Sequence, residues 1–177
     1  MAIGLFLLRV TLGLTLAAHG AQKLFGWFGG LGLDGTGQGL EALGFHPGRR
    51  HALMGGVVEM TGGLLLAIGL ATPVAATIFV AVMFVAAVGV HMRNGFFITE
   101  NGYEYNLVLA VSGVTLAFTG PGELSLDGFL EWPTRGTAWG LAAIIVGLIG
   151  GSVQLAQRHS TAWPTTNGSG QHRGTAA

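Results

Sequence analysis

The chain has 177 residues, of which 50% are hydrophobic, only 9% are charged and 32 are glycine. Soluble domains carry about 25% charged residues, so this composition indicates a membrane protein with several apolar helices. The formal net charge is zero and no basic stripe is present, which argues against a nucleic-acid partner. The absence of cysteine excludes a dithiol active site, thiolate metal ligands and iron–sulfur clusters within the chain.

The first predicted span covers residues 2–24. It carries Arg9, His19 and Lys23 on one side of the helix, together with small residues that let a second helix approach closely. The segment lacks a basic n-region and a convincing cleavage site, so we interpret it as a retained span and not as a signal peptide. Lys23 alone also fits a charge that snorkels from a helix end.

Residues 25–50 form a glycine-rich connection with aromatic side chains, which are typical of an interfacial loop, and we expect a short surface helix at 38–43. The run Gly30-Leu31-Gly32-Leu33-Asp34-Gly35 formally matches the dinucleotide-binding fingerprint. That fingerprint requires a strand before it and a helix after it within a βαβ unit, whereas here a membrane span precedes it. We therefore expect no nucleotide site.

The second predicted span, residues 52–70, contains Glu59 as its only charge and is long enough to cross a hydrocarbon core of about 30 Å. Glycines surround this acid and are expected to form a packing surface for another helix: Gly55, Gly56, Gly62 and Gly63. An ionisable side chain at this depth is a functional-site candidate whose partner must be found. The alternative is a paired or protonated Glu59 that only locks neighbouring helices together.

Three more spans are predicted at 73–92, 104–120 and 137–157, so residues 1–157 form a single all-α transmembrane domain. The last span bears Gly140, Gly147 and Gly151, which are expected to pack against a partner or a second copy. The polar segment 158–177 lacks periodicity and is predicted to be a disordered tail. The connections rich in lysine and arginine all lie on one side of these five spans, which predicts the N-terminus outside and the C-terminus in the cytoplasm.

This topology brings several polar side chains toward the inner half of the membrane. Beyond Glu59 and the basic groups of the first span, the cluster is expected to include His91, Glu104 and Asn106. From helix rise, we also predict an Arg9–Glu59 ion pair. His19 and Glu59 are the candidate catalytic residues, Arg9 and Lys23 belong to the ligand-binding or structural cluster, and no metal site is expected.

Several of these segments resemble the DoxX family of small integral membrane proteins. The resemblance rests on Leu8-Arg9-Val10, on His19 to Gly26, on Glu59 to Gly69 and on Asn94 to Gly122 with Leu126-Asp127, and it covers roughly residues 3–130. It implies a four-transmembrane-helix bundle, to which residues 137–157 add a fifth, C-terminal span. It also implies a redox setting in a bacterial plasma membrane, with subunits similar to thiosulfate:quinone oxidoreductase.

These observations predict an integral membrane subunit of an oxidoreductase assembly, whose pocket binds a quinone or a small sulfur oxyanion. His19 or Glu59 supplies protons to a quinone, whereas Arg9 and Lys23 suit an oxyanion. A less favoured variant has His19 and His91 as axial ligands of a haem. The alternative function is a non-enzymatic scaffold or chaperone that anchors partner proteins. A transporter is disfavoured because no inverted repeat is present. Beyond the lipid bilayer, the expected partners are redox proteins or a second copy of the chain.

Overall fold

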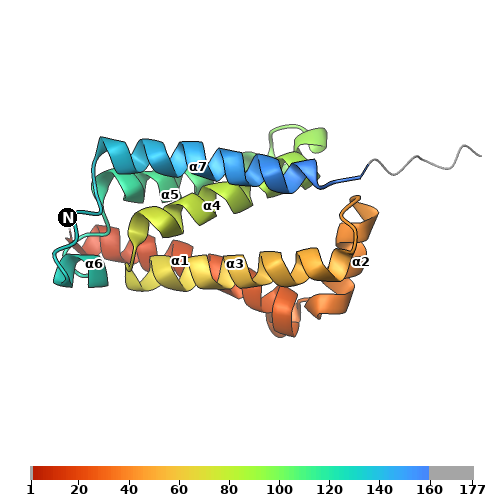
Figure 1. The fold of residues 1–177 in the computed structure, drawn as a ribbon, viewed down its shortest axis with the longest axis horizontal. Coiled ribbons are helices and arrows are strands. Elements are labelled where there is room, and N and C mark those ends of the chain that lie inside the picture. Colours follow the sequence, from red (N-terminus) through yellow and green to blue (C-terminus); the bar gives the residue numbers. More distant parts are fainter. Residues whose placement is uncertain (1, 160–177) are drawn as a thin grey trace, which may run out of the picture.

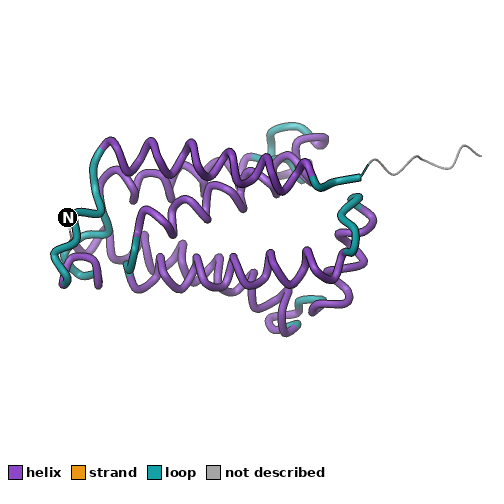
Figure 2. Tube along the Cα trace, viewed as in Figure 1, coloured by secondary structure: helices purple, strands orange, loops and turns teal. Residues whose placement is uncertain are grey.

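The computed structural model describes residues 2–159, which form helices and connecting loops without a strand. The all-helical prediction is therefore confirmed. The long helices lie in two layers (Figures 1 and 2). One layer contains α1 (Ala2–Phe25) and α3 (Gly48–Ile68), and the other contains α4 (Thr72–Ala86), α5 (Glu104–Thr119) and α7 (Thr137–Ala156). The predicted disordered tail lies outside the described residues from residue 160 onward.

Shorter elements gather at the two ends of the layers. At one end are η1 (Trp27–Gly29) and α2 (Gly32–Ala42), and at the other are the start of α1 and α6 (Leu126–Phe129) (Figure 1). Between α4 and α5 the chain forms η2 (Ala87–His91), η3 (Met92–Asn94) and η4 (Ile98–Glu100). The surface helix in the first connection is thus α2, which begins six residues before the start expected from sequence.

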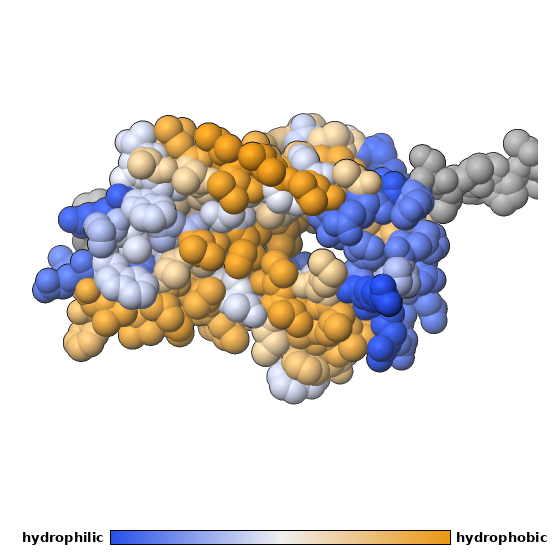
Figure 3. All heavy atoms as spheres, in the orientation of Figure 1, coloured by the Kyte–Doolittle hydropathy of each residue, from blue (hydrophilic) through white to orange (hydrophobic). Residues whose placement is uncertain are grey.

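Within residues 2–159, four helical segments are long and apolar enough to cross a membrane: Ala2–Phe25, Gly48–Ile68, Thr72–Asn94 and Thr137–Ala156. The fourth predicted span, residues 104–120, is a shorter apolar helix, α5, because its 16 residues reach only about 24 Å. Apolar residues cover the middle of the molecule and hydrophilic ones gather toward its ends (Figure 3). The protein is therefore a multi-pass membrane protein, whose exposed apolar side chains face lipid.

Glycines bring α1 and α3 into backbone contact. A Cβ atom on Gly13 would lie 2.4 Å from Ala67 N, and one on Gly63 would lie 2.4 Å from Ala17 N. Side chains cannot be accommodated at such distances, so the two helices cross through paired small residues, as in other membrane bundles.

The four glycines around Glu59 meet different neighbours. Gly63 faces α1, whereas Gly56 lies against the Leu24 side chain and Gly62 against Ile78 of α4. These three positions pack as predicted. The prediction is wrong for Gly55, where an added Cβ would have no atom within 4 Å, because at this level α3 has separated from the second layer and faces open space.

The glycines of α7 pack inside the chain. An added Cβ on Gly140 would meet Phe118 of α5, and those on Gly147 and Gly151 would meet Val80 and Phe84 of α4. The expectation that these glycines dock a partner or a second copy is therefore wrong. They allow α7 to lie closely against α4 and α5, which leaves the opposite face of α7 apolar and exposed.

Candidate functional site

The antiparallel register of α1 and α3 separates the predicted polar cluster into two groups. Gly13 lies against Ala67, and Gly20 lies against Met60. Continuing this register places Arg9 at the α3–α4 turn and brings Lys23 beside Glu59, with which it forms an ion pair. The predicted Arg9–Glu59 pair is therefore wrong: the two residues lie more than two helical turns apart along the bundle, whereas the sequence estimate had aligned the spans by their ends.

Arg9 is only 1% exposed and holds the end of α3. Its Nη1 donates a hydrogen bond to the carbonyl oxygen of Ala67 (2.6 Å), and its Nη2 donates one to the carbonyl oxygen of Leu124. Its guanidinium carbon also lies 5.5 Å from the centre of the Phe6 ring, within cation–π range. Arg9 thus satisfies a terminal carbonyl of α3 and ties it to the loop before α6.

Asp127 completes this end of the molecule and is also 1% exposed. Its carboxylate accepts hydrogen bonds from the N–H groups of Ala71 (2.7 Å) and Thr72 (2.8 Å), so it caps α4 from a distant part of the chain. Its own N–H donates to the carbonyl oxygen of Gly69 (2.8 Å). We refer to Arg9, Asp127 and the α3–α4 turn between them as the Arg9–Asp127 junction.

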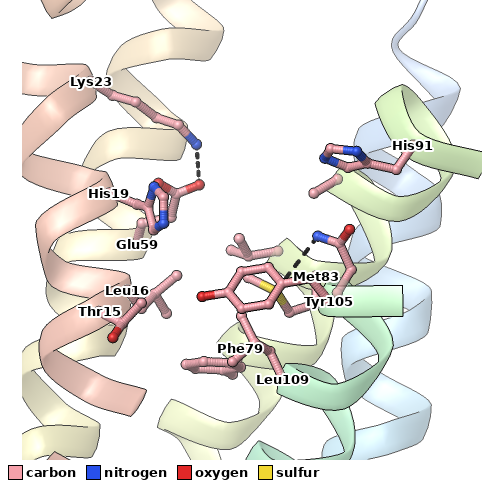
Figure 4. Close-up of a pocket in the computed structure, with 13 residues that line it drawn as sticks. Thr15, Leu16, His19, Lys23, Glu59, Phe79, Met83, His91, Tyr105 and Leu109 are labelled. Atoms are coloured by element: carbon pink, nitrogen blue, oxygen red, sulfur yellow. Dashed lines mark hydrogen bonds and ion pairs between the residues drawn. The ribbon is translucent and has the colours of Figure 1, made fainter. Parts of the chain in front are cut away.

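The second polar group lines a cavity of about 230 Å³ between the two layers. Figure 4 shows side chains entering it from both sides. The lining residues are Thr15, Leu16, His19, Lys23, Glu59, Phe79, Val82, Met83, Ala86, His91, Tyr105, Asn106 and Leu109. The polar end of this cavity contains four predicted site residues beside Glu59, and its opposite end is apolar.

Glu59 is the most informative group in the cavity because its carboxylate is only half bonded. Oε1 forms the ion pair with Lys23, and the Glu59 side chain is 5% exposed. Oε2 is buried and has no hydrogen-bond partner among residues 2–159. An unbonded buried oxygen is costly, so this atom is available to accept a hydrogen bond from a ligand in the cavity.

The second layer supplies the opposite wall. His91 lies in the π-helical turn η2, a local widening of the kind often found at functional sites. One ring nitrogen of His91, Nδ1, is hydrogen-bonded to the carbonyl oxygen of Asn101 (2.9 Å), which fixes the ring at the cavity edge. Asn106 is 6% exposed, and among residues 2–159 its Nδ2 donates one long hydrogen bond, to Met83 Sδ at 3.8 Å. Its amide therefore has hydrogen-bonding capacity to spare.

Comparison with known proteins places this chain in a family. The DoxX family model matches residues 4–92, which make up half of the chain. The chain belongs to the DoxX family. It is also 29% identical over 128 residues to a protein of Bacillus subtilis (strain 168) named "Putative oxidoreductase CatD", and the alignment covers 72% of this chain and 87% of that protein. No solved structure matches the chain.

The DoxX segment contains most of the predicted site residues, but they do not all meet. His19, Lys23, Glu59 and His91 share the cavity, and Asn106 joins them from beyond the segment. Arg9 lies in the Arg9–Asp127 junction instead. Glu104 does not line the cavity: its Oε2 accepts a hydrogen bond from Ile98 N (3.0 Å) and orders the turn before α5.

Two residues, one in the cavity wall and one in the Arg9–Asp127 junction, escaped the prediction of site residues from sequence. Tyr105 lines the cavity, although the sequence prediction named only its neighbours Glu104 and Asn106. Asp127 was noted only within the DoxX-like motif, and its burial is invisible without the α3–α4 turn that it caps. Within residues 2–159, no three His, Asp or Glu side chains come together in a way that would hold a metal ion.

Proposed function

We propose that this DoxX protein is the membrane subunit of an oxidoreductase assembly and that its cavity binds the ring of a quinone in its hydroquinone form. The observation that carries the proposal is the buried, unbonded Oε2 of Glu59 at the polar end of the cavity. A hydroquinone hydroxyl supplies the hydrogen bond that this oxygen lacks. The name of the B. subtilis relative supports the redox setting.

The size of the cavity supports a single ring. An apolar cavity of about 150 Å³ is large enough to bind benzene, so a cavity of about 230 Å³ accommodates a substituted six-membered ring. Phe79, Met83 and Leu109 provide apolar surface for the faces of the ring. The same volume is below the range of about 300–1,000 Å³ typical of pockets for larger ligands, which favours a single ring over a porphyrin held by His19 and His91.

The polar groups are suited to proton movement. Glu59 accepts a hydrogen bond from a ring hydroxyl through Oε2, while Lys23 stabilises its negative charge through Oε1. His19 extends from α1 beside Glu59 (Figure 4) and is exposed, so it can pass a proton between the cavity and its opening. Asn106 donates from the opposite wall to a second ring oxygen. In this proposal, a partner protein exchanges electrons with the ring.

A sulfur oxyanion is less well supported than a hydroquinone. Of the two cations proposed to bind it, Arg9 lies outside the cavity and Lys23 is already paired with Glu59. An incoming anion would face the unbonded carboxylate oxygen, which repels it. The charges of the cavity therefore favour a neutral ligand with hydrogen-bond donors.

We propose that the polar end of the cavity lies toward the cytoplasmic side of a bacterial plasma membrane. Lys23, Arg49, Arg50, Arg93 and Arg158 all belong to this end of the helices, whereas Arg135 belongs to the opposite end. The positive-inside rule then places α2 and the end of α7 at the cytoplasmic surface.

The proposal is tested by binding of trimethylhydroquinone to the full chain in lipid nanodiscs. Glu59→Gln keeps the shape of the side chain but removes the charge-assisted acceptor, and we expect it to raise the Kd at least tenfold. The matched control is Glu104→Gln, the same change outside the cavity, which should leave the Kd within twofold. Equal Kd values for the wild type and Glu59→Gln contradict the proposal and favour the scaffold function, in which Glu59 only locks α3 to α1.

A further inference from the structure

The cavity is not closed on the side where α1 and α5 face each other. His19 of α1 is exposed, and Tyr105 of α5 is 46% exposed, although both line the cavity. Figure 4 shows the Tyr105 ring extending from α5 toward α1, with its hydroxyl group directed to the region of Thr15. The cavity therefore has a lateral opening, and Tyr105 lies across it.

This opening faces the region of the acyl chains. Thr15 lies near the middle of the 24-residue helix α1, well inside the hydrocarbon core. One helical turn from Tyr105, Val108 is 57% exposed on α5, as expected for a lipid-facing side chain. A molecule that leaves the cavity here passes directly into the bilayer.

The volume of the cavity decides what can occupy this opening. A space of about 230 Å³ is filled by one substituted ring and holds no long chain in addition. The polar end of the cavity is formed by Glu59 and Lys23, and the apolar end by Leu16, Phe79 and Leu109. A ligand whose hydroxyl meets Glu59 must therefore direct any hydrocarbon substituent away from the polar end and out through the side.

We propose that the opening between α1 and α5 is a lateral passage from the bilayer and that it holds the hydrocarbon tail of the hydroquinone whose ring lies against Glu59. Tyr105 covers this passage when the site is empty and packs along the tail when it is filled. The inference rests on the proposed function and adds to it the class of ligand, a lipid-soluble hydroquinone with a tail, together with its route of entry.

A second opening gives the inference a clear competitor. Figure 3 shows a gap between the two layers on the side of α3 and α7, toward the end at which α2 lies. Gly55 of α3 has no atom within 4 Å of an added Cβ, so α3 is uncovered at that level. None of the cavity-lining residues belongs to α7, however, whereas three belong to α5. The cavity therefore lies nearer to α1 and α5 than to α7, and we assign the tail to the α1–α5 side.

Photo-cross-linking in nanodiscs distinguishes the two routes. The probe is a trimethylhydroquinone with a ten-carbon tail that bears a diazirine in mid-chain, and adducts are located by mass spectrometry of the full chain. We expect adducts on α1 and α5 near Thr15 and Val108, and we expect excess tail-free trimethylhydroquinone to abolish them. Displaceable adducts on α3 and α7 would overturn the lateral passage while leaving the proposed function intact. Adducts that the tail-free compound does not displace would overturn both.

A labelling experiment provides an independent measure, because the chain has no native cysteine. Tyr105→Cys and Gly55→Cys are each coupled to a bulky maleimide, and the Kd of the tailed compound is divided by that of the tail-free compound. The label at Tyr105→Cys is expected to raise this ratio at least tenfold over the unlabelled variant, whereas the label at Gly55→Cys leaves it within twofold. A rise only with the Gly55→Cys label contradicts the assignment.

Discussion

Two buried carboxylates, Asp127 and Glu59, occupy opposite ends of the bundle and differ in how completely they are bonded. Both oxygens of Asp127 accept backbone hydrogen bonds, so neither oxygen is left without a partner. Glu59 uses one oxygen for Lys23 and leaves the other unbonded beside a cavity. Burial of a charge in a membrane protein therefore does not by itself identify a ligand site. The incomplete bonding of Glu59 is what distinguishes it from a purely structural group.

The largest expected effect is the loss of the Arg9–Asp127 junction. Asp127→Ala leaves two N–H groups at the start of α4 without acceptors and Arg9 without a nearby countercharge, so we expect a loss of about 3–5 kcal/mol in the free energy of unfolding. Reversible unfolding in mixed micelles measures it. Glu59→Gln serves as the comparison, since its partner Lys23 has a 34% exposed side chain and can reach water. If Glu59→Gln destabilises the protein as much as Asp127→Ala, the contrast between the two ends is wrong.

The next effect concerns the contact between α1 and α3. Gly63→Ala introduces a Cβ atom 2.4 Å from Ala17 N, which forces the helices apart and should destabilise the protein by about 1–3 kcal/mol. Gly55→Ala is the matched control on the same helix, because its Cβ meets open space. Thermal unfolding midpoints of the two variants test the prediction. Equal midpoints would show that the close approach is not required.

A smaller effect is expected from Lys23→Met. This change removes the ion pair that holds the Glu59 carboxylate in place, so the acceptor for the hydroquinone is less well oriented. We expect the Kd for trimethylhydroquinone to rise about tenfold, which corresponds to about 1.4 kcal/mol. Titration in nanodiscs measures the change. A tighter Kd would indicate that Lys23 competes with the ligand for Glu59.

The smallest effect is expected at the exposed ion pair between Arg49 and Asp34. Their side chains are 71% and 81% exposed and lie 2.9 Å apart. Water and salt screen such pairs strongly, so Arg49→Ala should leave both the unfolding midpoint and the hydroquinone Kd unchanged within error. A clear change in the Kd would mean that charge at this surface affects the cavity. The comparison of Asp127 with Glu59 would then leave out an effect on ligand binding.

The sequence predicted the helices better than their register. Hydrophobic length identified the segments that became α1, α3, α4 and α7, because the bilayer requires about twenty apolar residues for each span. The pairing of Arg9 with Glu59 failed because sequence alone does not tell how far one helix slides along another. In the structure, contacts at Gly13 and Gly20 set this register. Glycine spacing indicated that close contacts exist but not which glycine meets which backbone.

The candidate site was predicted in part for the same reason. His19, Lys23, Glu59, His91 and Asn106 do line one cavity, since residues at the same end of neighbouring spans lie near one another. Arg9 and Glu104 were misplaced because depth in the membrane does not fix the direction of a side chain. The π-helical turn that places His91 leaves no recognisable sequence signal, as neither proline nor a polar insertion marks it.

Asp127 also affects the order in which the protein is assembled. The carboxylate that caps α4 at Ala71 and Thr72 lies 55 residues further along the chain than the second of these groups. A nascent chain that has delivered its first three spans to the membrane therefore carries a hairpin whose turn has unsatisfied N–H groups. The DoxX segment, residues 4–92, ends before the residue that completes its own turn. We therefore expect the capping of the α3–α4 turn to wait for the loop after α5, so that a chain stopped before Asp127 leaves this turn open to other hydrogen-bond acceptors.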